Sequence, residues 1–234
     1  MVNTPYIIMP VKDAIDMAEI SLRAIVQSGY SVVVYDDNSS APTCQRLNEL
    51  VTELGIEVIH IAEHTNHPSP NYRWVLQHAR QKALAQNQHL IIIESDVVVQ
   101  PSTIQQLVEQ VQPRVGMVAA VTTDEAGNIN FPYEYATNWH KELSVETRKR
   151  LSFCCTLLTN ELMQALDFTL LNPAKNWYDV TISHWSSKAG FRNLLMLKNT
   201  VLHQPHASRP WKQLKYTNPL LYYWRKLTQN KDRI

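Results

Sequence analysis

The first 120 residues alternate between short apolar runs and longer segments in which apolar residues recur at helical spacing. The apolar runs predict five strands, at residues 6–9, 31–35, 57–61, 90–93 and 115–121. Between them, apolar side chains three or four residues apart predict four helices. Strands that are apolar throughout and alternate with helices are typical of a mostly parallel sheet with helices on both faces. This half of the chain is therefore predicted to adopt an α/β fold.

The second half of the chain has a mixed pattern. Residues 131–150 hold aromatic and charged side chains without a clear period, whereas Cys154–Leu158 and two short runs within 194–203 predict strands. Asn160 and Asp179 are the expected N-cap residues of two further helices. No internal repeat and no Pro-, Gly- or Ser-rich linker interrupts the sequence. We therefore predict one domain over residues 1–234, with a mixed C-terminal half.

Composition narrows the possible classes of function. Lys and Arg number 22 against 21 Asp and Glu, a formal net charge of +1, which argues against a nucleic-acid partner. The five glycines leave no room for a Gly-rich phosphate-binding loop. Three cysteines, two of them adjacent, do not make a disulfide framework, and no segment resembles a signal peptide or a membrane span. We expect a cytoplasmic protein, with peripheral contact to the inner face of a membrane as a further option.

Acidic residues follow three of the predicted strands: Asp13, Asp36, Asp37, Glu94 and Asp96. Ligands of parallel α/β sheets bind just beyond the carboxyl ends of the strands. Carboxylates in that place would repel an anionic ligand unless a divalent cation bridged the two. The pattern predicts a Mg²⁺ or Mn²⁺ site for a phosphorylated ligand, although acidic residues also form ordinary turns and helix caps at strand ends.

Five segments, taken in order, resemble those of a known family. YIIMPVKD, SVVVYDDNSS and LIIIESDVVVQPSTIQQL end three strands with a proline, an Asp-Asp-x-Ser pattern and an acid-x-acid triplet. NWYDVTISHWSSKAGF and KNTVLHQPHAS follow, as a helix that starts with an acid and a strand that carries a histidine. In this order the segments are similar to the family-2 glycosyltransferases of the GT-A fold. The resemblance implies a Rossmann-like sandwich of the GT-A type.

The resemblance implies nucleotide-binding roles for seven residues: Pro10, Val11, Asp36, Asp37, Arg73, Glu94 and Ser95. Pro10 and Val11 would line the base. Asp37, with Asp36 adjacent, would accept a hydrogen bond from the uracil of a UDP-sugar. Glu94 and Ser95 belong to the triplet and would lie near the ribose or the metal.

The resemblance also implies a metal site and a catalytic base. Asp96, the last residue of the triplet, and His203 would bind Mn²⁺ or Mg²⁺, and Asp179 would be the general base. Two residues depart from the family pattern, because Glu94 and Tyr178 stand where Asp and an acidic residue are usual. The Q-x-x-R-W motif and membrane helices of processive synthases are missing from the sequence, which favours the transfer of a single sugar.

The implied activity is that of a metal-dependent, inverting transferase of the hexosyltransferase type. It would move a sugar from a nucleotide-diphosphate sugar to a hydroxyl of a glycan, lipid-linked or small-molecule acceptor, in glycan or polysaccharide biosynthesis. Residues 1–121 would form the nucleotide-sugar-binding half and residues 122–208 the acceptor-binding half. Two alternatives remain: a nucleotidyltransferase, which normally has a Gly-rich segment where this chain has PVKDA, and a non-catalytic nucleotide-sugar binder, which would not need Asp179.

Several of these residues have simpler structural interpretations. Asp13 and Asp179 are expected to cap helices. His60, His64 and His67 form H-x3-H-x2-H, a spacing that invites a zinc site, but they enter a Pro-rich loop and we expect a loop without zinc. Cys154 and Cys155 are expected to be buried packing residues.

The C-terminal segment, residues 209–234, combines aromatic residues with seven Lys or Arg and one Asp, a net charge of +6. A helix packed on the domain with a solvated basic face is the simpler interpretation. An interfacial anchor on anionic lipid is the alternative, since each basic residue near such a surface contributes about 1 kcal/mol.

Overall fold

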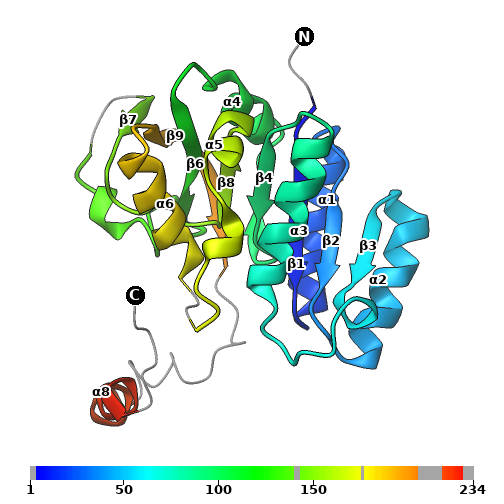
Figure 1. The fold of residues 1–234 in the computed structure, drawn as a ribbon. Coiled ribbons are helices and arrows are strands. Elements are labelled where there is room, and N and C mark those ends of the chain that lie inside the picture. Colours follow the sequence, from blue (N-terminus) through cyan, green and yellow to red (C-terminus); the bar gives the residue numbers. More distant parts are fainter. Residues whose placement is uncertain (1–3, 140–142, 175–176, 205–217, 229–234) are drawn as a thin grey trace.

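The computed structural model describes residues 4–139, 143–174, 177–204 and 218–228. Its centre is a single mixed sheet with helices on both faces (Figure 1). The strands are β1 (Tyr6–Val11), β2 (Val33–Asp36), β3 (Glu57–His60), β4 (Leu90–Ile93), β5 (Val97–Val98), β6 (Val115–Thr123), β7 (Ser144–Glu146), β8 (Cys155–Leu158) and β9 (Arg192–His203). The sheet order is β3-β2-β1-β4-β8-β6-β9-β5, and β7 pairs with β9.

The helices occupy the segments between the strands. They are α1 (Ile15–Gln27), α2 (Ala41–Leu54), α3 (Tyr72–Ala85), α4 (Thr103–Glu109), α5 (Asn160–Ala165), α6 (Tyr178–Lys188) and α8 (Pro219–Thr228), with short 3₁₀ turns η1 (Ile61–Glu63), η2 (Glu134–Ala136) and η3 (Phe168–Leu170). The α/β first half and the mixed second half predicted from the sequence are both confirmed.

The strands divide into a parallel part and a mixed part. β1 pairs in parallel with β2 and β4, and β2 with β3, as apolar strands joined by helices require. β8 then enters between β4 and β6 and runs antiparallel to both. β9 lies parallel to β6 and antiparallel to β5 and β7. This arrangement brings the end of β9 back to the segment that follows β4.

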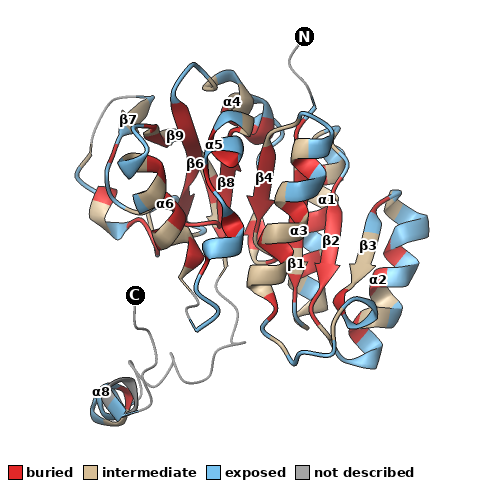
Figure 2. Ribbon diagram, viewed as in Figure 1, coloured by how far each residue is buried: buried red, intermediate tan, exposed pale blue. Residues whose placement is uncertain are grey.

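Two layers of apolar side chains hold the helices against the sheet, and Figure 2 shows the buried residues concentrated on the strands. One layer packs α1, α2 and α4 through residues such as Leu22, Leu47 and Leu107. The other packs α3, α5 and α6 through residues such as Leu76 and Leu162. Because both faces are covered, polar groups collect at the strand ends and not on the sheet.

The structure contradicts three expected helix caps. Asp13 precedes the actual N-cap of α1, Ala14, and its carboxylate accepts the backbone N–H of Ser40 at 2.8 Å instead. Thr159, not Asn160, caps α5 through its hydroxyl. Asp179 lies within the first turn of α6, one residue after the helix begins. In each case the polar residue was correctly placed near a helix start, but a neighbouring residue has the non-helical backbone of the cap.

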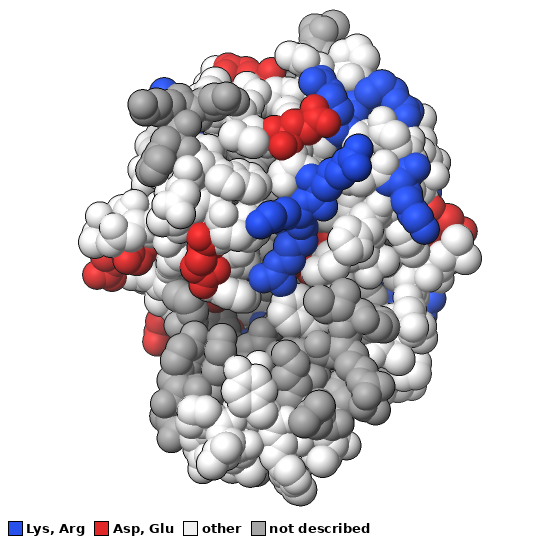
Figure 3. All heavy atoms as spheres, turned by 90° about the vertical axis from the view of Figure 1, so that its left-hand side faces the viewer, with Lys and Arg blue, Asp and Glu red and all other residues white. Residues whose placement is uncertain are grey.

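Charged side chains are unevenly distributed over the surface. Figure 3 shows Lys and Arg in a band on one face, with Asp and Glu beside it, so the nearly neutral chain is locally polarised.

In the part of the chain that the structure describes, no helix combines the length and apolar character that a bilayer crossing requires. Most of the basic segment 209–234 lies outside the described residues. Within α8, Leu220, Tyr223 and Trp224 are exposed, and membrane contact stays a prediction.

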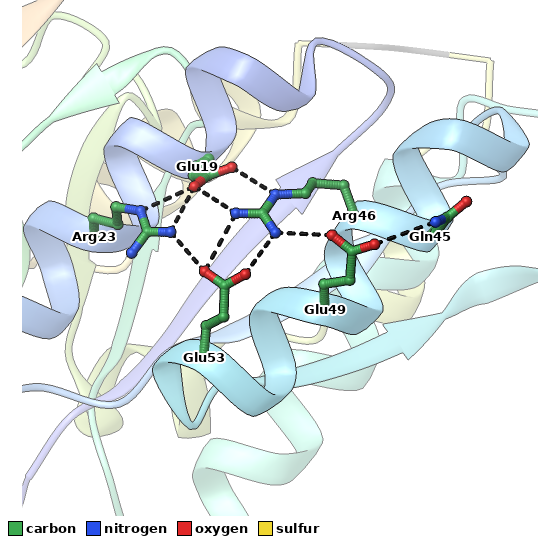
Figure 4. Close-up of polar contacts among 6 residues, drawn as sticks. All are labelled: Glu19, Arg23, Gln45, Arg46, Glu49 and Glu53. Atoms are coloured by element: carbon green, nitrogen blue, oxygen red, sulfur yellow. Dashed lines mark hydrogen bonds and ion pairs between the residues drawn. The ribbon is translucent and has the colours of Figure 1, made fainter.

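An ion-pair network joins α1 to α2 (Figure 4). Glu19 accepts hydrogen bonds from Arg23 at 2.6 Å and from Arg46 at 2.8 Å, and Arg46 also contacts Glu49 and Glu53. Arg46, and then Arg23, lower the pKa of Glu19 from 4.5 to about 2. Several charges fixed in one network stabilise a surface more than isolated pairs do.

Substitution of Glu19 by Gln tests this network. A carboxylate with a lowered pKa stabilises the fold fully above its ordinary pKa of 4.5, and this contribution is lost as the pH falls through about 2. We expect Glu19→Gln to lose about 1 kcal/mol at neutral pH, a figure reduced for solvent screening. The deficit should shrink in the acid range, as measured by urea unfolding at a series of pH values.

The control is Glu49→Gln, because Glu49 is 47% exposed and pairs with only one of the two arginines. Its effect should be smaller. An acid sensitivity of Glu19→Gln equal to that of the wild type would contradict this account of the network.

Candidate active site

The carboxyl ends of β1, β2 and β4 form one edge of the sheet, and the sequence-predicted acidic residues lie along it. Asp36 is the last residue of β2 and pairs in register with Val11 of β1. The backbone N–H of Asp37 then donates to the Val11 carbonyl at 2.8 Å. Val11 is buried and Pro10, one residue earlier in β1, is half-buried.

The Asp37 carboxylate is held by a loop that precedes α3. Ser69 Oγ and the backbone N–H of Asn71 donate to Asp37 Oδ2 at 2.8 and 2.9 Å, and Asn71 Nδ2 donates to Oδ1 at 2.7 Å. Three donors use three of the four accepting positions of a carboxylate. Asp37 is therefore fixed in orientation and keeps one accepting position on Oδ1.

Asp36 is oriented quite differently. Its Oδ1 accepts the backbone N–H of Ser39 at 3.1 Å, and its Oδ2 contacts Cys44 Sγ at 3.4 Å and His60 Nδ1 at 2.9 Å. Burial raises the pKa of Asp36, but hydrogen bonds from Ser39, His60 and Cys44 outweigh burial and hold this pKa below its ordinary value. The two aspartates, which the resemblance grouped as nucleotide ligands, thus contact separate sets of residues.

The triplet Glu94-Ser95-Asp96 forms the tight turn between β4 and β5. The turn is closed by a hydrogen bond from Val97 N–H to the Glu94 carbonyl at 3.1 Å, and the Ser95 carbonyl accepts Ser21 Oγ at 3.0 Å. Beyond the turn, Val97 pairs with His203 in the antiparallel β5–β9 ladder. This ladder places His203 Nε2 3.6 Å from Asp96 Oδ2.

The orientation of His203 is fixed by its second ring nitrogen. His203 Nδ1 lies 2.7 Å from the Phe131 carbonyl, to which only an N–H can donate, so Nε2 is the nitrogen that faces Asp96. Burial lowers the pKa of His203, but Asp96, Glu94 and the Phe131 carbonyl outweigh it and raise the pKa above its ordinary value.

These donors fit a divalent cation. A carboxylate oxygen and an imidazole nitrogen 3.6 Å apart can both reach one ion with bonds of about 2.0–2.2 Å. The hydrogen bond from Nδ1–H to a backbone carbonyl is the support that ligating histidines usually have. Asp96 and His203, 107 positions apart in the sequence, are therefore brought together as the resemblance implied.

Asp179 lies in the first turn of α6, and its charge acts on the buried Tyr133. Tyr133 Oη accepts the N–H of Ser152 at 2.9 Å and is fully buried. Burial raises the pKa of Tyr133, and Cys154, Tyr135 and Asp179 add to the increase. Cys154 Sγ in turn donates to Glu94 Oε2 at 3.3 Å. Tyr133 is thus within electrostatic reach of Asp179, and Cys154 contacts Glu94 of the triplet.

Arg73 lies in the first turn of α3 and reaches toward the second half of the chain. Its Nη2 donates to the Thr169 carbonyl at 2.7 Å, and its charge partly offsets the increase that burial causes in the pKa of Tyr178. Arg73 is therefore near Tyr178, the residue that precedes Asp179 at the start of α6, and its buried Nε–H has no hydrogen-bond acceptor among the described residues.

The sequence did not reveal the supporting residues of this site. Ser69 and Asn71 hold Asp37, and Asn130 Nδ2 donates to the His203 carbonyl at 3.1 Å. Single Asn and Ser residues in irregular segments carry no pattern that marks them. Cys154, expected only to pack, is buried as expected and also contacts Glu94.

No curated protein matches the chain. Among solved structures, one of GalNAc-T7 with UDP, GalNAc and Mn²⁺ superposes with a TM-score of 0.60 at 13% identity, covering 86% of this chain and 43% of that one. TarS of S. aureus superposes with a TM-score of 0.58 at 14% identity, covering 95% of this chain and 39% of that one. A mycobacterial protein gives a TM-score of 0.54 at 13% identity, with coverages of 87% and 68%.

The chain thus spans less than half the length of the first two structures, and at these identities the likeness confirms the fold, which is of the GT-A type. The sequence match is more specific. Residues 6–163 match the family described as glycosyl transferase family 2. This match runs from β1 into α5, covers more than half of the chain and includes the Asp36-Asp37 pair and the acidic triplet. The chain therefore belongs to glycosyl transferase family 2.

Proposed function

We propose that this protein is an inverting glycosyltransferase that moves a sugar from a UDP-sugar to an acceptor hydroxyl, with a divalent cation at Asp96 and His203. The observation that carries the proposal is the 3.6 Å approach of His203 Nε2 to Asp96 Oδ2 at the carboxyl edge of the sheet. Family membership supports the reaction class. The similar structure of GalNAc-T7 was solved with UDP and Mn²⁺, which supports the choice of nucleotide and metal.

The donor would lie along the edge formed by β1, β2 and β4. Pro10 and Val11 would line the base, and the remaining accepting position on Asp37 Oδ1 would take the N–H of uracil. Glu94 and Ser95 would contact the ribose, and Arg73 would offer Nε to the donor. Asp36 acts from behind this surface, since its carboxylate already holds Ser39 and His60.

The reaction would be a displacement at the anomeric carbon. Asp179 accepts the proton of the acceptor hydroxyl, whose oxygen attacks the carbon from the face opposite the leaving UDP. Mn²⁺ or Mg²⁺, when bound, supplies positive charge that stabilises the leaving diphosphate. The acceptor, whether a glycan, a lipid-linked molecule or a small molecule, would approach from residues 122–208, the half that carries Asp179 and the loop from Asn130 to Tyr133.

Asp96→Asn tests the metal site. The amide keeps the shape of the side chain but not its charge, so Mn²⁺-dependent UDP affinity should fall at least 10- to 100-fold, the range that even indirect partners of metal ligands contribute. Isothermal titration with UDP, with and without Mn²⁺, measures the difference. Asp16→Asn, an exposed acid on α1, is the control, and equal Mn²⁺ dependence in both variants would remove Asp96 from the site.

Asn71→Ala tests the arrangement around Asp37. The substitution removes the 2.7 Å hydrogen bond to Asp37 Oδ1 and leaves the buried carboxylate with one hydrogen bond fewer. Loss of such a bond to a charged group costs about 1.5–3 kcal/mol. We expect lower unfolding stability and UDP affinity weaker by about tenfold, in titration and in denaturant unfolding. Ser69→Ala removes one of two donors to Oδ2 and should have the smaller effect; the reverse order would contradict the proposed orientation of Asp37.

Asp179→Asn tests the catalytic base. Asn keeps the size of the side chain in the first turn of α6 but cannot accept the acceptor proton, so kcat should fall about 10²- to 10⁴-fold while UDP-sugar affinity stays nearly constant. Asp167→Asn, which alters a similar helix-start acid that caps η3, should keep full turnover. Wild-type transfer by Asp179→Asn would place the base elsewhere.

The same measurements separate the alternatives. A non-catalytic binder would bind UDP with Mn²⁺ but show no UDP release from any UDP-sugar in wild type or variant. A nucleotidyltransferase would release pyrophosphate from a nucleoside triphosphate and sugar phosphate. Release of UDP that depends on Asp179 supports the glycosyltransferase against both.

A further inference from the structure

A second group of possible metal ligands lies behind the donor-binding edge. Asp36 ends β2, His60 ends β3, and Cys44 lies in the first turn of α2. Their ligand atoms all lie within 4.8 Å of one another, the one such cluster of three among the described residues. Asp36 and His60 are partners in the register of the parallel β2–β3 pair, so their side chains leave the sheet on the same side.

The distances within this triad suit a single small ion. Asp36 Oδ2 is 2.9 Å from His60 Nδ1 and 3.4 Å from Cys44 Sγ. Around a tetrahedral Zn²⁺, the bond lengths to oxygen, nitrogen and sulfur separate these pairs by about 3.4 and 3.6 Å. Shifts of about half an ångström would therefore admit the ion. Asp36 Oδ1 accepts the backbone N–H of Ser39, which leaves Oδ2 as the oxygen that faces the other two ligands.

The hydrogen bonds of His60 provide an independent argument. Nδ1 faces Asp36 Oδ2 at 2.9 Å, and Nε2 faces Asn48 Oδ1 at 3.1 Å. Both ring nitrogens thus face an oxygen, but a neutral imidazole has a single N–H. In the protein without an ion, Nδ1–H donates to Asp36 Oδ2, which leaves the lone pair of Nε2 facing the Asn48 oxygen. A cation on Nδ1 would move the ring proton to Nε2, where it donates to Asn48 Oδ1, and Asn48 would then orient the ring as the outer partner of a ligating histidine.

We propose that Asp36, Cys44 and His60 bind one divalent cation of the zinc class. A donor set of one sulfur, one nitrogen and one oxygen favours Zn²⁺ over Mg²⁺ or Mn²⁺, which prefer oxygen. Cys44 and His60 are only half-buried, so water can take the fourth position. This site is separate from Asp96 and His203, and it does not depend on the proposed transfer reaction.

Ion binding would change the proton content of the triad. In the protein without an ion, the Cys44 thiol donates to Asp36 Oδ2 at 3.4 Å. Binding replaces the S–H bond with an S–metal bond and releases the proton to solvent, so affinity rises with pH. The ion would join β2, α2 and β3, and it would stabilise the strand end that carries Asp37.

From the sequence we expected no zinc site among His60, His64 and His67, and the three histidines do not gather around one point. His64 stacks on Trp74, with ring centroids 5.3 Å apart, and the His67 carbonyl accepts the side chains of Asn38 and Asn71. Of the three histidines in H-x3-H-x2-H, only His60 joins the triad. The other two ligands come from β2 and α2, a combination that the spacing within the loop does not indicate.

Cobalt provides the test, because Co²⁺ in place of Zn²⁺ gives a thiolate-to-cobalt charge-transfer absorption band only when a cysteine is a ligand. The full chain is stripped with a chelator, saturated with Mg²⁺ to fill any site at Asp96 and His203, and titrated with Co²⁺. We expect one equivalent to produce the band, and Zn²⁺ to displace it. Cys44→Ser should abolish the band, and Asn48→Ala should weaken Co²⁺ binding about 10- to 100-fold.

Two matched controls keep the result specific. Cys154→Ser removes the other thiol that lies beside a carboxylate, Glu94, and should keep the band. His64→Asn alters a histidine outside the triad and should also keep it, whereas His60→Asn should lose it. Circular dichroism confirms that each variant is folded, and Zn²⁺ should raise the melting temperature of the wild type but not of Cys44→Ser.

Three outcomes would overturn the proposal. The first is no thiolate band in the wild type, which would leave the triad a hydrogen-bonded cluster without metal. The second is a band that survives in Cys44→Ser and disappears in Cys154→Ser, which would place the ion beside Glu94. The third is equal stabilisation of wild type and Cys44→Ser by Zn²⁺.

Discussion

The candidate active site depends on a ladder of two residue pairs. β5 contains only Val97 and Val98, yet its antiparallel pairing with β9 brings His203 beside Asp96. The turn that precedes β5 is closed by its own backbone hydrogen bond, and Asp96 also accepts the N–H of Gln204 through its carbonyl. Without this short ladder, no strand pairing would place His203 beside the acidic triplet. β9 also runs parallel to β6, so one long strand joins the mixed part of the sheet to the segment after β4.

Strand alternation explains why two adjacent aspartates have different surroundings. Successive side chains of an extended segment leave it on opposite sides. Asp36 therefore turns toward α2 and β3, where it meets Cys44 and His60, while Asp37 turns toward the loop of Ser69 and Asn71. A sequence pattern such as Asp-Asp-x-Ser presents the two acids as one unit. In the folded protein they have separate surroundings, because their side chains leave the chain on opposite sides.

The sequence predicted the structure well where apolar residues recur at a regular spacing or where a residue typical of an element boundary is present. The strands of the first half and the helices between them followed from apolar spacing, because both faces of that sheet are buried. The family resemblance identified the Asp96–His203 pair, which spacing alone could not reveal, since the two residues meet only through the β5–β9 pairing. The observed N-caps differ from the expected ones by one or two residues, and two of them, Ala14 and Trp177, are apolar residues that a search for polar caps does not find. The irregular region gave no signal for Asn71, Asn130 or Tyr133, whose positions are set by tertiary hydrogen bonds.

The loop from Asn130 to Tyr133 has a consequence for any attempt to redesign the acceptor preference of this enzyme. Its backbone carbonyl at Phe131 fixes the His203 ring, and the Asn130 side chain holds the His203 carbonyl. The loop is also tied to β6 through Thr122, whose hydroxyl donates to the carbonyls of both Asn130 and Phe131. Under the proposed function, grafting a foreign loop here would therefore disturb the orientation of His203 and, with it, the proposed cation site as well as acceptor choice. Directed evolution of new acceptors would do better to vary the exposed residues of this region and to leave residues 130–133 as they are.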